Sequence, residues 1–162
     1  MRRRFIIYMF VLASFLLLNG CEKRGLVIEG NKEKKPLEFK LHQIQCPQCH
    51  MEVDTLNHAL EVVLDDGKTY IFDDPGCVIL WLDTNKIDPK EVVIWAYSGD
   101  THRWIDAKKA YYSLTDNTPM KYGFGAYEKK KDSYISFDEM RIKMLRGENL
   151  TNPKIRKKLL GR

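Results

Sequence analysis

Long apolar runs are scarce in this chain of 162 residues, and it holds only four cysteines, four histidines and six prolines. The one extended apolar run covers residues 5–18 and is shorter than the roughly 20 residues that span a bilayer. Arg2, Arg3 and Arg4 precede it. A basic cluster before a short apolar run is typical of a secretory signal. We therefore expect export and no membrane-spanning helix after the signal.

The residues that end this run indicate how the chain is held. Leu18-Asn19-Gly20-Cys21 resembles the lipobox of bacterial lipoproteins. The resemblance implies a signal peptide over residues 1–20, cleavage before Cys21 and acylation of its thiol. An uncleaved anchor is the alternative. Residues 22–40 are charged and lack a hydrophobic period, so a lipidated flexible tether is expected over residues 21–40. Either anchor holds an exported domain at a membrane.

Acidic residues are nearly missing from the C-terminal end. Residues 41–140 hold 10 Lys and Arg against 17 Asp and Glu, a net of −7, whereas residues 141–162 hold eight against one, a net of +7. We predict a folded domain over residues 41–146 and a basic tail over 147–162. The tail suits anionic lipid headgroups or an acidic partner, or it is a solvated, partly disordered end. An export signal argues against a nucleic-acid partner.

Three segments of similar pattern follow one another in the domain. Residues 58–82, 91–114 and 122–145 each show a short apolar strand, a polar turn, a second strand and an apolar residue followed by Asp. The turns lie at residues 65–67, 98–100 and 129–132. The expected helix starts, at Phe72, Ile105 and Phe137, are spaced by 33 and then 32 residues. This pattern predicts an α+β fold of repeated β-hairpin–helix units.

Capping residues support each expected helix. Asp74 precedes Pro75, which suits a first helical position, and Asp106 can cap the second helix. Ser136 and Glu139 form a capping-box pattern for the third. Apolar residues then recur at helical spacing, and we expect them in the core. They are Cys77, Leu80, Trp81, Ala107, Ala110, Tyr111, Leu114, Phe137, Met140 and Met144.

The densest group of soft metal ligands is the sequence CPQCHM, with Cys46, Cys49 and Met51. Thiolates and thioethers select Cu(I), which accepts two or three such ligands. Met120 lies far away in sequence, but it precedes the third unit much as Met51 precedes the first. If the units are related by pseudo-symmetry, the two methionine sulfurs lie at one end of the fold. Bacteria handle copper largely outside the cytoplasm, which agrees with the export signal.

A family resemblance rests on the lipobox together with CPQCHM, FDDPGC, Trp81, IDAKKAYY and TPMKYGFGAY. This combination resembles the NosL family, the nitrous-oxide reductase accessory lipoproteins, over about residues 42–128. The resemblance implies a periplasmic Cu(I) chaperone, not an enzyme, built from two small similar halves. It further implies metal binding at Cys46, Cys49, Met51 and Met120, and delivery of Cu(I) to a copper enzyme or its assembly machinery. The lipid anchor would lie in the cell membrane or the outer membrane, facing the periplasm.

Two further residues are candidate ligands. His50 stands where the family usually has Gly, so either it ligates the metal or it is an exposed loop residue in a turn that suits Gly better. Cys77 is expected in the first turn of a helix, where the helix dipole lowers a thiol pKa. Its apolar neighbours instead favour an inert buried thiol. His42, His58 and His102 show no ligand spacing.

Two other functions compete with copper delivery. Cys46, Cys49 and Cys77 could join His50 or His58 around a structural Zn²⁺, or the first two could form a disulfide. A thiol–disulfide oxidoreductase also uses a Cys-x-x-Cys motif. Such enzymes place it at the start of a helix, however, and no helical period follows Cys49. We therefore favour a Cu(I) carrier without catalytic residues.

Overall fold

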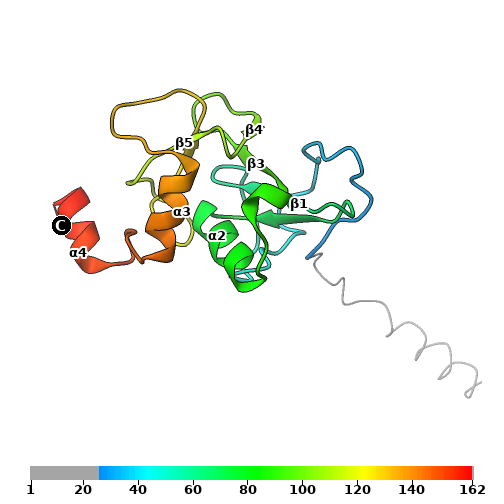
Figure 1. Ribbon diagram of the computed structural model, residues 1–162, viewed down its shortest axis with the longest axis horizontal. Coiled ribbons are helices and arrows are strands. Elements are labelled where there is room, and N and C mark those ends of the chain that lie inside the picture. Colours follow the sequence, from blue (N-terminus) through cyan, green and yellow to red (C-terminus); the bar gives the residue numbers. More distant parts are fainter. Residues whose placement is uncertain (1–25, 162) are drawn as a thin grey trace, which may run out of the picture.

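The computed structural model describes residues 26–161 and has an α+β fold (Figure 1). The expected signal peptide, the expected lipidation site Cys21 and the start of the expected tether lie outside these residues. Four antiparallel strands form the main sheet in the order β2-β1-β3-β4, and β5 pairs with β6 in a second, two-stranded sheet. The elements are β1 Leu60–Val63, β2 Thr69–Phe72, α2 Pro75–Thr84, η1 Pro89–Glu91, β3 Val93–Tyr97, β4 Trp104–Asp106, β5 Tyr111–Tyr112, β6 Ala126–Tyr127, α3 Phe137–Leu145 and α4 Pro153–Leu160.

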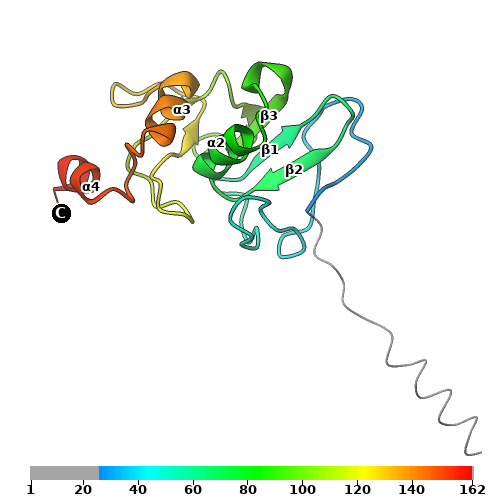
Figure 2. The same cartoon turned by 60° about the horizontal axis from the view of Figure 1, so that its bottom comes forward.

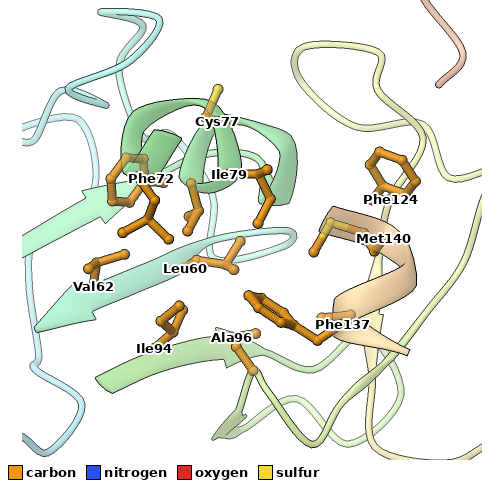
Figure 3. Packing of buried hydrophobic residues seen from close by; sticks show 14 of the residues in the cluster. Leu60, Val62, Phe72, Cys77, Ile79, Ile94, Ala96, Phe124, Phe137 and Met140 are labelled. Carbon is orange, nitrogen blue, oxygen red and sulfur yellow. The ribbon is translucent and has the colours of Figure 1, made fainter. Parts of the chain in front are cut away.

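The first hairpin–helix unit is present as the sequence predicts. β1 and β2 pair across the turn at residues 65–67, and α2 follows directly. The Asp74 side chain accepts a hydrogen bond from the Gly76 N–H at 2.9 Å, which caps a helix that begins with Pro75. Helix α2 packs on the sheet face that carries Leu60 and Ile94 (Figure 3). This cluster is the main hydrophobic core.

The N-terminal segment covers the opposite face of the sheet. Ile28 forms an isolated bridge with Thr69, the Leu37 N–H donates to both carboxylate oxygens of Glu61, and the Trp95 ring N–H donates to the carbonyl oxygen of Lys34 at 2.9 Å. A second apolar cluster lies on this face, formed by Ile44, Val53, Ala59 and Ile71, with Ile28, Phe39, Leu41 and Trp104 packed against it. Residues 28–37 are therefore attached to the sheet, and the expectation of a flexible tether is wrong for this stretch.

The second unit forms its hairpin but not its helix. β3 and β4 pair across the expected turn. Asp106 accepts a hydrogen bond from the Lys108 N–H at 3.0 Å, as a cap would, yet the chain makes only one turn. Tyr112 then enters a strand, where its backbone bonds to Ile135, and its buried hydroxyl donates to the carbonyl oxygen of Ala107 at 2.8 Å. Strand pairing on both sides of Tyr112 replaces the expected helix.

The third unit forms its helix but not its hairpin. Ser136 and Glu139 make the expected capping box of α3, and Met140 and Met144 are buried in the core. The two strands that should pair with each other lie instead on either side of Tyr112, since β6 pairs with β5 and Ile135 bridges to Tyr112. The α+β class is thus confirmed, whereas a repeated architecture of two similar halves is not.

The basic C-terminal segment contains a helix instead of a disordered tail. Asn152 caps α4, Pro153 begins it, and Gly161 ends it in the left-handed conformation at φ +72°. None of the α4 residues is buried. In Figures 1 and 2, α4 lies at the end of the described molecule opposite the N-terminal segment. Among residues 26–161, no helix has the length and apolar character needed to cross a bilayer.

Candidate metal centre

The loop at residues 46–51 folds back on itself beside the main core. The Cys46 N–H donates to the Met51 carbonyl oxygen at 2.9 Å, and the His50 N–H donates to the Cys46 carbonyl oxygen at 2.9 Å. His50 closes the turn in the left-handed conformation, at φ +60°. Cys46 is fully buried and Cys49 is half-buried. The tight turn therefore presents both thiols to the same side of the domain.

The start of α2 supplies the other half of the centre. Asp73 follows β2 directly, and Cys77 lies in the first turn of the helix. The Cys77 side chain is fully buried, but it points away from the sheet residues that α2 covers (Figure 3). The Cys49 thiol donates to the two carboxylate oxygens of Asp73 at 3.3 and 3.4 Å. The loop and the helix start thus meet through their polar and thiol groups.

Four side chains converge where these segments meet. One ligand atom each from Cys46, Cys49, Asp73 and Cys77 lies within 4.8 Å of every other. Because Zn–S bonds are about 2.3 Å long, two sulfur ligands of one ion lie at most about 4.6 Å apart, so a small inward shift from the 4.8 Å limit would let the group surround one ion. Within residues 26–161 this is the one group of histidine, cysteine or acidic side chains with such spacing. The group could hold a metal ion.

The charges of the group favour a cation. Hydrogen bonds from the Cys46 and Cys77 thiols lower the pKa of Cys49 to about 4. Donating to Cys46 and Cys49 raises the pKa of Cys77 far above its ordinary value, and burial raises the pKa of Asp73 to about 7. When Cys49 is ionised, its thiolate accepts a hydrogen bond from the protonated carboxyl group of Asp73. A metal ion would replace the protons that keep the other groups neutral.

The backbone N–H groups of both candidate methionines contact residues at or beside this centre. A hydrogen bond from the Met51 N–H contributes to the lowered pKa of Cys49, and the Met51 side chain is 41% exposed. The Met120 N–H donates to Asp74 at 3.1 Å, next to Asp73 in the chain. The half-buried Met120 side chain packs against the main core. Tertiary contacts at the start of α2, and not a pseudo-symmetric repeat, place Met120 in this region.

The histidines stand apart from the four-residue group. His50 is exposed, and its ring is not among the convergent ligand atoms. Its left-handed backbone does explain why a glycine suits this position. His58 lies 3.9 Å from Asp116 on the far side of the β3–β4 hairpin turn, and burial lowers its pKa. Neither histidine completes the cysteine cluster in the way that the sequence-based zinc hypothesis required.

Asp73 is the member of the group that the sequence did not reveal. The pair Asp73-Asp74 indicated a helix start, but the pattern does not tell which carboxylate caps the helix and which faces the thiols. Cys77 was a candidate ligand, although its apolar neighbours favoured an inert core position. The structure places it in the cluster because the first turn of α2 projects it toward the 46–51 loop.

Gly76 sets the approach of the Met120 loop to α2. A Cβ at residue 76 would lie 2.3 Å from Cδ2 of the Tyr122 ring, far inside van der Waals contact. We expect Gly76→Ala to displace the ring and to destabilise the protein by about 1–3 kcal/mol. Chemical denaturation measures this change. Because Gly→Ala inside a helix normally stabilises by up to about 1 kcal/mol, a gain in stability for Gly76→Ala would contradict close packing here.

Comparison of the chain with models of protein families, with curated proteins and with solved structures found no match.

Proposed function

We propose that this protein is an exported, lipid-anchored Cu(I) carrier that delivers the ion to a copper enzyme. The observation that carries the proposal is the convergence of three thiols and one carboxylate on a single point. Soft sulfur ligands favour Cu(I), Zn²⁺ and iron–sulfur clusters over hard cations, and the methionines beside the thiols favour Cu(I) among these. Cys49 is only half-buried, so the centre is accessible from one side, as transfer to a partner requires.

The proposed ligands include the two methionines. Cys46 and Cys49 provide thiolates, and Met51 and Met120 provide thioethers from the two loops that flank the cluster. The exposed Met51 side chain suits a ligand that meets the ion first or releases it last. By resemblance to the NosL family, the recipient is nitrous-oxide reductase or its assembly machinery. We place the chain on the periplasmic face of the cell membrane or outer membrane, as a carrier and not an enzyme.

A Cu(I) titration against a chelator of known affinity tests this function. We expect one Cu(I) per reduced protein, bound more tightly than Zn²⁺. Met120→Leu keeps the size and apolar character of the side chain but removes its sulfur, and we expect it to weaken binding about tenfold, as the loss of one weak ligand. Met140→Leu is the matched control, because Met140 is a core methionine away from the centre. Equal effects of the two variants would exclude Met120 as a ligand.

Oxidation distinguishes the contribution of the cysteines to Cu(I) binding from that of the methionines. A disulfide between Cys46 and Cys49 would remove two thiolates in an oxidising compartment, whereas methionine forms no disulfide. We expect oxidised protein to bind Cu(I) weakly through Met51 and Met120, and reduction to restore full affinity. Equal affinity before and after reduction would remove the cysteines from the site.

A structural zinc site is the second candidate, and the number of ligands favours it. Zn²⁺ prefers four N, S or O ligands, and the cluster offers three thiols and the Asp73 carboxylate without any methionine. A structural zinc would stabilise the fold, so removing metal would unfold the domain. Circular dichroism of the metal-free protein decides between the two: a carrier stays folded without its ion. The oxidoreductase hypothesis has less support, because Cys46 and Cys49 lie in a turn and the next helix begins only at Pro75.

A further inference from the structure

The C-terminal helix α4 is a short helix at the surface of the domain. It has eight residues, and not one of them is buried. Isolated helices of this length are marginal in water, because nucleation is costly and few hydrogen bonds follow. The segment just before α4 is nevertheless attached to the domain. Leu150 is buried against Gly123, and the Leu150 N–H donates to the Tyr122 carbonyl oxygen at 3.1 Å. The chain therefore holds α4 at one end of the molecule, with its surface open (Figures 1 and 2).

The residues of α4 form a basic amphipathic surface. Ile155 and Leu159 are four residues apart and share one side of the helix, and Leu159 is 36% exposed. Lys154 and Lys158 lie along one flank of this pair and Arg156 along the other. Among the described residues, none of the Lys or Arg side chains of α4 forms an ion pair.

Charge complementarity identifies the kind of surface that would cover α4. An apolar pair flanked by cations is typical of helices that lie in the headgroup region of an anionic bilayer. The rest of the domain is acidic, with a net of −7 over residues 41–140, so an anionic surface repels it and attracts the basic end. We propose that α4 docks on anionic phospholipid and so sets the orientation of the protein at its membrane.

The anchor makes this contact local, a step that rests on the proposed lipidation. Only six residues, 22–27, separate Cys21 from Ile28, the first described residue bonded to the sheet, and a fully extended chain over these seven steps reaches at most about 25 Å. The domain therefore stays close to the bilayer. Because the N-terminal segment and α4 lie at opposite ends of the described molecule, contacts at both ends lay its long dimension along the membrane (Figure 1).

Hydrogen exchange on the full chain tests the docking of α4. The protein is reconstituted into nanodiscs of phosphatidylcholine alone, or of phosphatidylcholine and phosphatidylglycerol in equal parts. We expect the amides of residues 154–160 to exchange at least about tenfold more slowly in the anionic discs. Raising the salt from about 0.1 M to about 1 M shortens the screening length from about 10 to about 3 Å and removes this protection. Equal exchange in the two kinds of disc would overturn the proposal.

A charge-matched pair of variants shows whether α4 itself is responsible. Lys154→Gln with Lys158→Gln removes two cations beside the apolar pair, and Lys129→Gln with Lys130→Gln removes two exposed cations elsewhere. We expect only the first pair to lose protection in anionic discs. Loss in both pairs alike would mean that the membrane responds to total charge, which also overturns the proposal. A Cu(I) titration of the same samples reports on the proposed function independently, because neither pair touches the cysteine cluster.

Discussion

Cys77→Ser is expected to weaken Cu(I) binding by about 100-fold. Serine keeps the size of the side chain and its hydrogen-bonding capacity, but it replaces a soft thiolate with a hard oxygen that Cu(I) does not favour. A 100-fold loss corresponds to about 2.8 kcal/mol, at about 1.4 kcal/mol per factor of ten. The prediction follows from the position of Cys77 within 4.8 Å of the ligand atoms of Cys46, Cys49 and Asp73. Chelator competition on reduced protein measures the change.

The control for this variant lies next to it in the chain. Val78 is buried on the same helix, and Val78→Ala disturbs packing without removing a sulfur. We expect Val78→Ala to lower the free energy of unfolding but to leave Cu(I) affinity unchanged. If Cys77→Ser also leaves the affinity unchanged, Cys77 is an inert core thiol. The ion would then be held by Cys46, Cys49 and the two methionines alone.

Glu61→Gln is expected to stabilise the protein at pH 8 by about 3 kcal/mol. Glu61 lies within β1, opposite Ile71 and Trp95 in neighbouring strands, and its side chain is fully buried beneath the N-terminal segment. Burial raises the pKa of Glu61 from its ordinary value of 4.5 to about 7, although the Leu37 N–H favours the charged form. The difference between these two pKa values sets the gain in the free energy of unfolding, at about 1.4 kcal/mol for each pKa unit. Glutamine keeps the shape and accepts the same N–H.

The pH dependence gives this prediction its sign. Below pH 4.5 the carboxyl is protonated in both states, so ionisation of Glu61 costs the folded protein nothing. Between pH 4.5 and 7 the unfolded chain ionises first, and stability falls as the pH rises; above pH 7 the full cost is present. The difference between Glu61→Gln and the parent should therefore grow from pH 4 to pH 8. Asp73 and Asp74, whose pKa values burial also raises, contribute alike to both proteins and cancel.

Urea unfolding at a series of pH values measures the Glu61 effect. Glu91→Gln serves as a control, since Glu91 is an exposed residue at the end of η1, just before the neighbouring strand β3. We expect its stability to follow that of the parent at every pH. A constant difference between Glu61→Gln and the parent across the series would show that Glu61 ionises normally, and that the N-terminal segment does not seal this face of the sheet.

Local signals in the sequence predicted much of the first unit and the last helix of the domain. Asp74 with Pro75, and Ser136 with Glu139, act within a few residues of themselves, so the caps of α2 and α3 are present as expected. The same kind of signal failed at Asp106. Its cap hydrogen bond forms, but Tyr112 is drawn into a strand between Ala126 and Ile135, and no short-range pattern contains that pairing.

The sequence by itself determined the caps, the first hairpin and the soft character of the ligands in the 46–51 loop. Each depends on residues that are neighbours in the chain. Only the tertiary structure decided that Asp73 and Cys77 face that loop, that residues 28–37 cover the sheet, and that α4 remains uncovered. The physical reason is the same in all three cases. Each depends on which segments far apart in the chain pack together, and this packing is determined by the burial of the whole hydrophobic core. The residues next to Asp73, Cys77 or α4 in the sequence do not specify it.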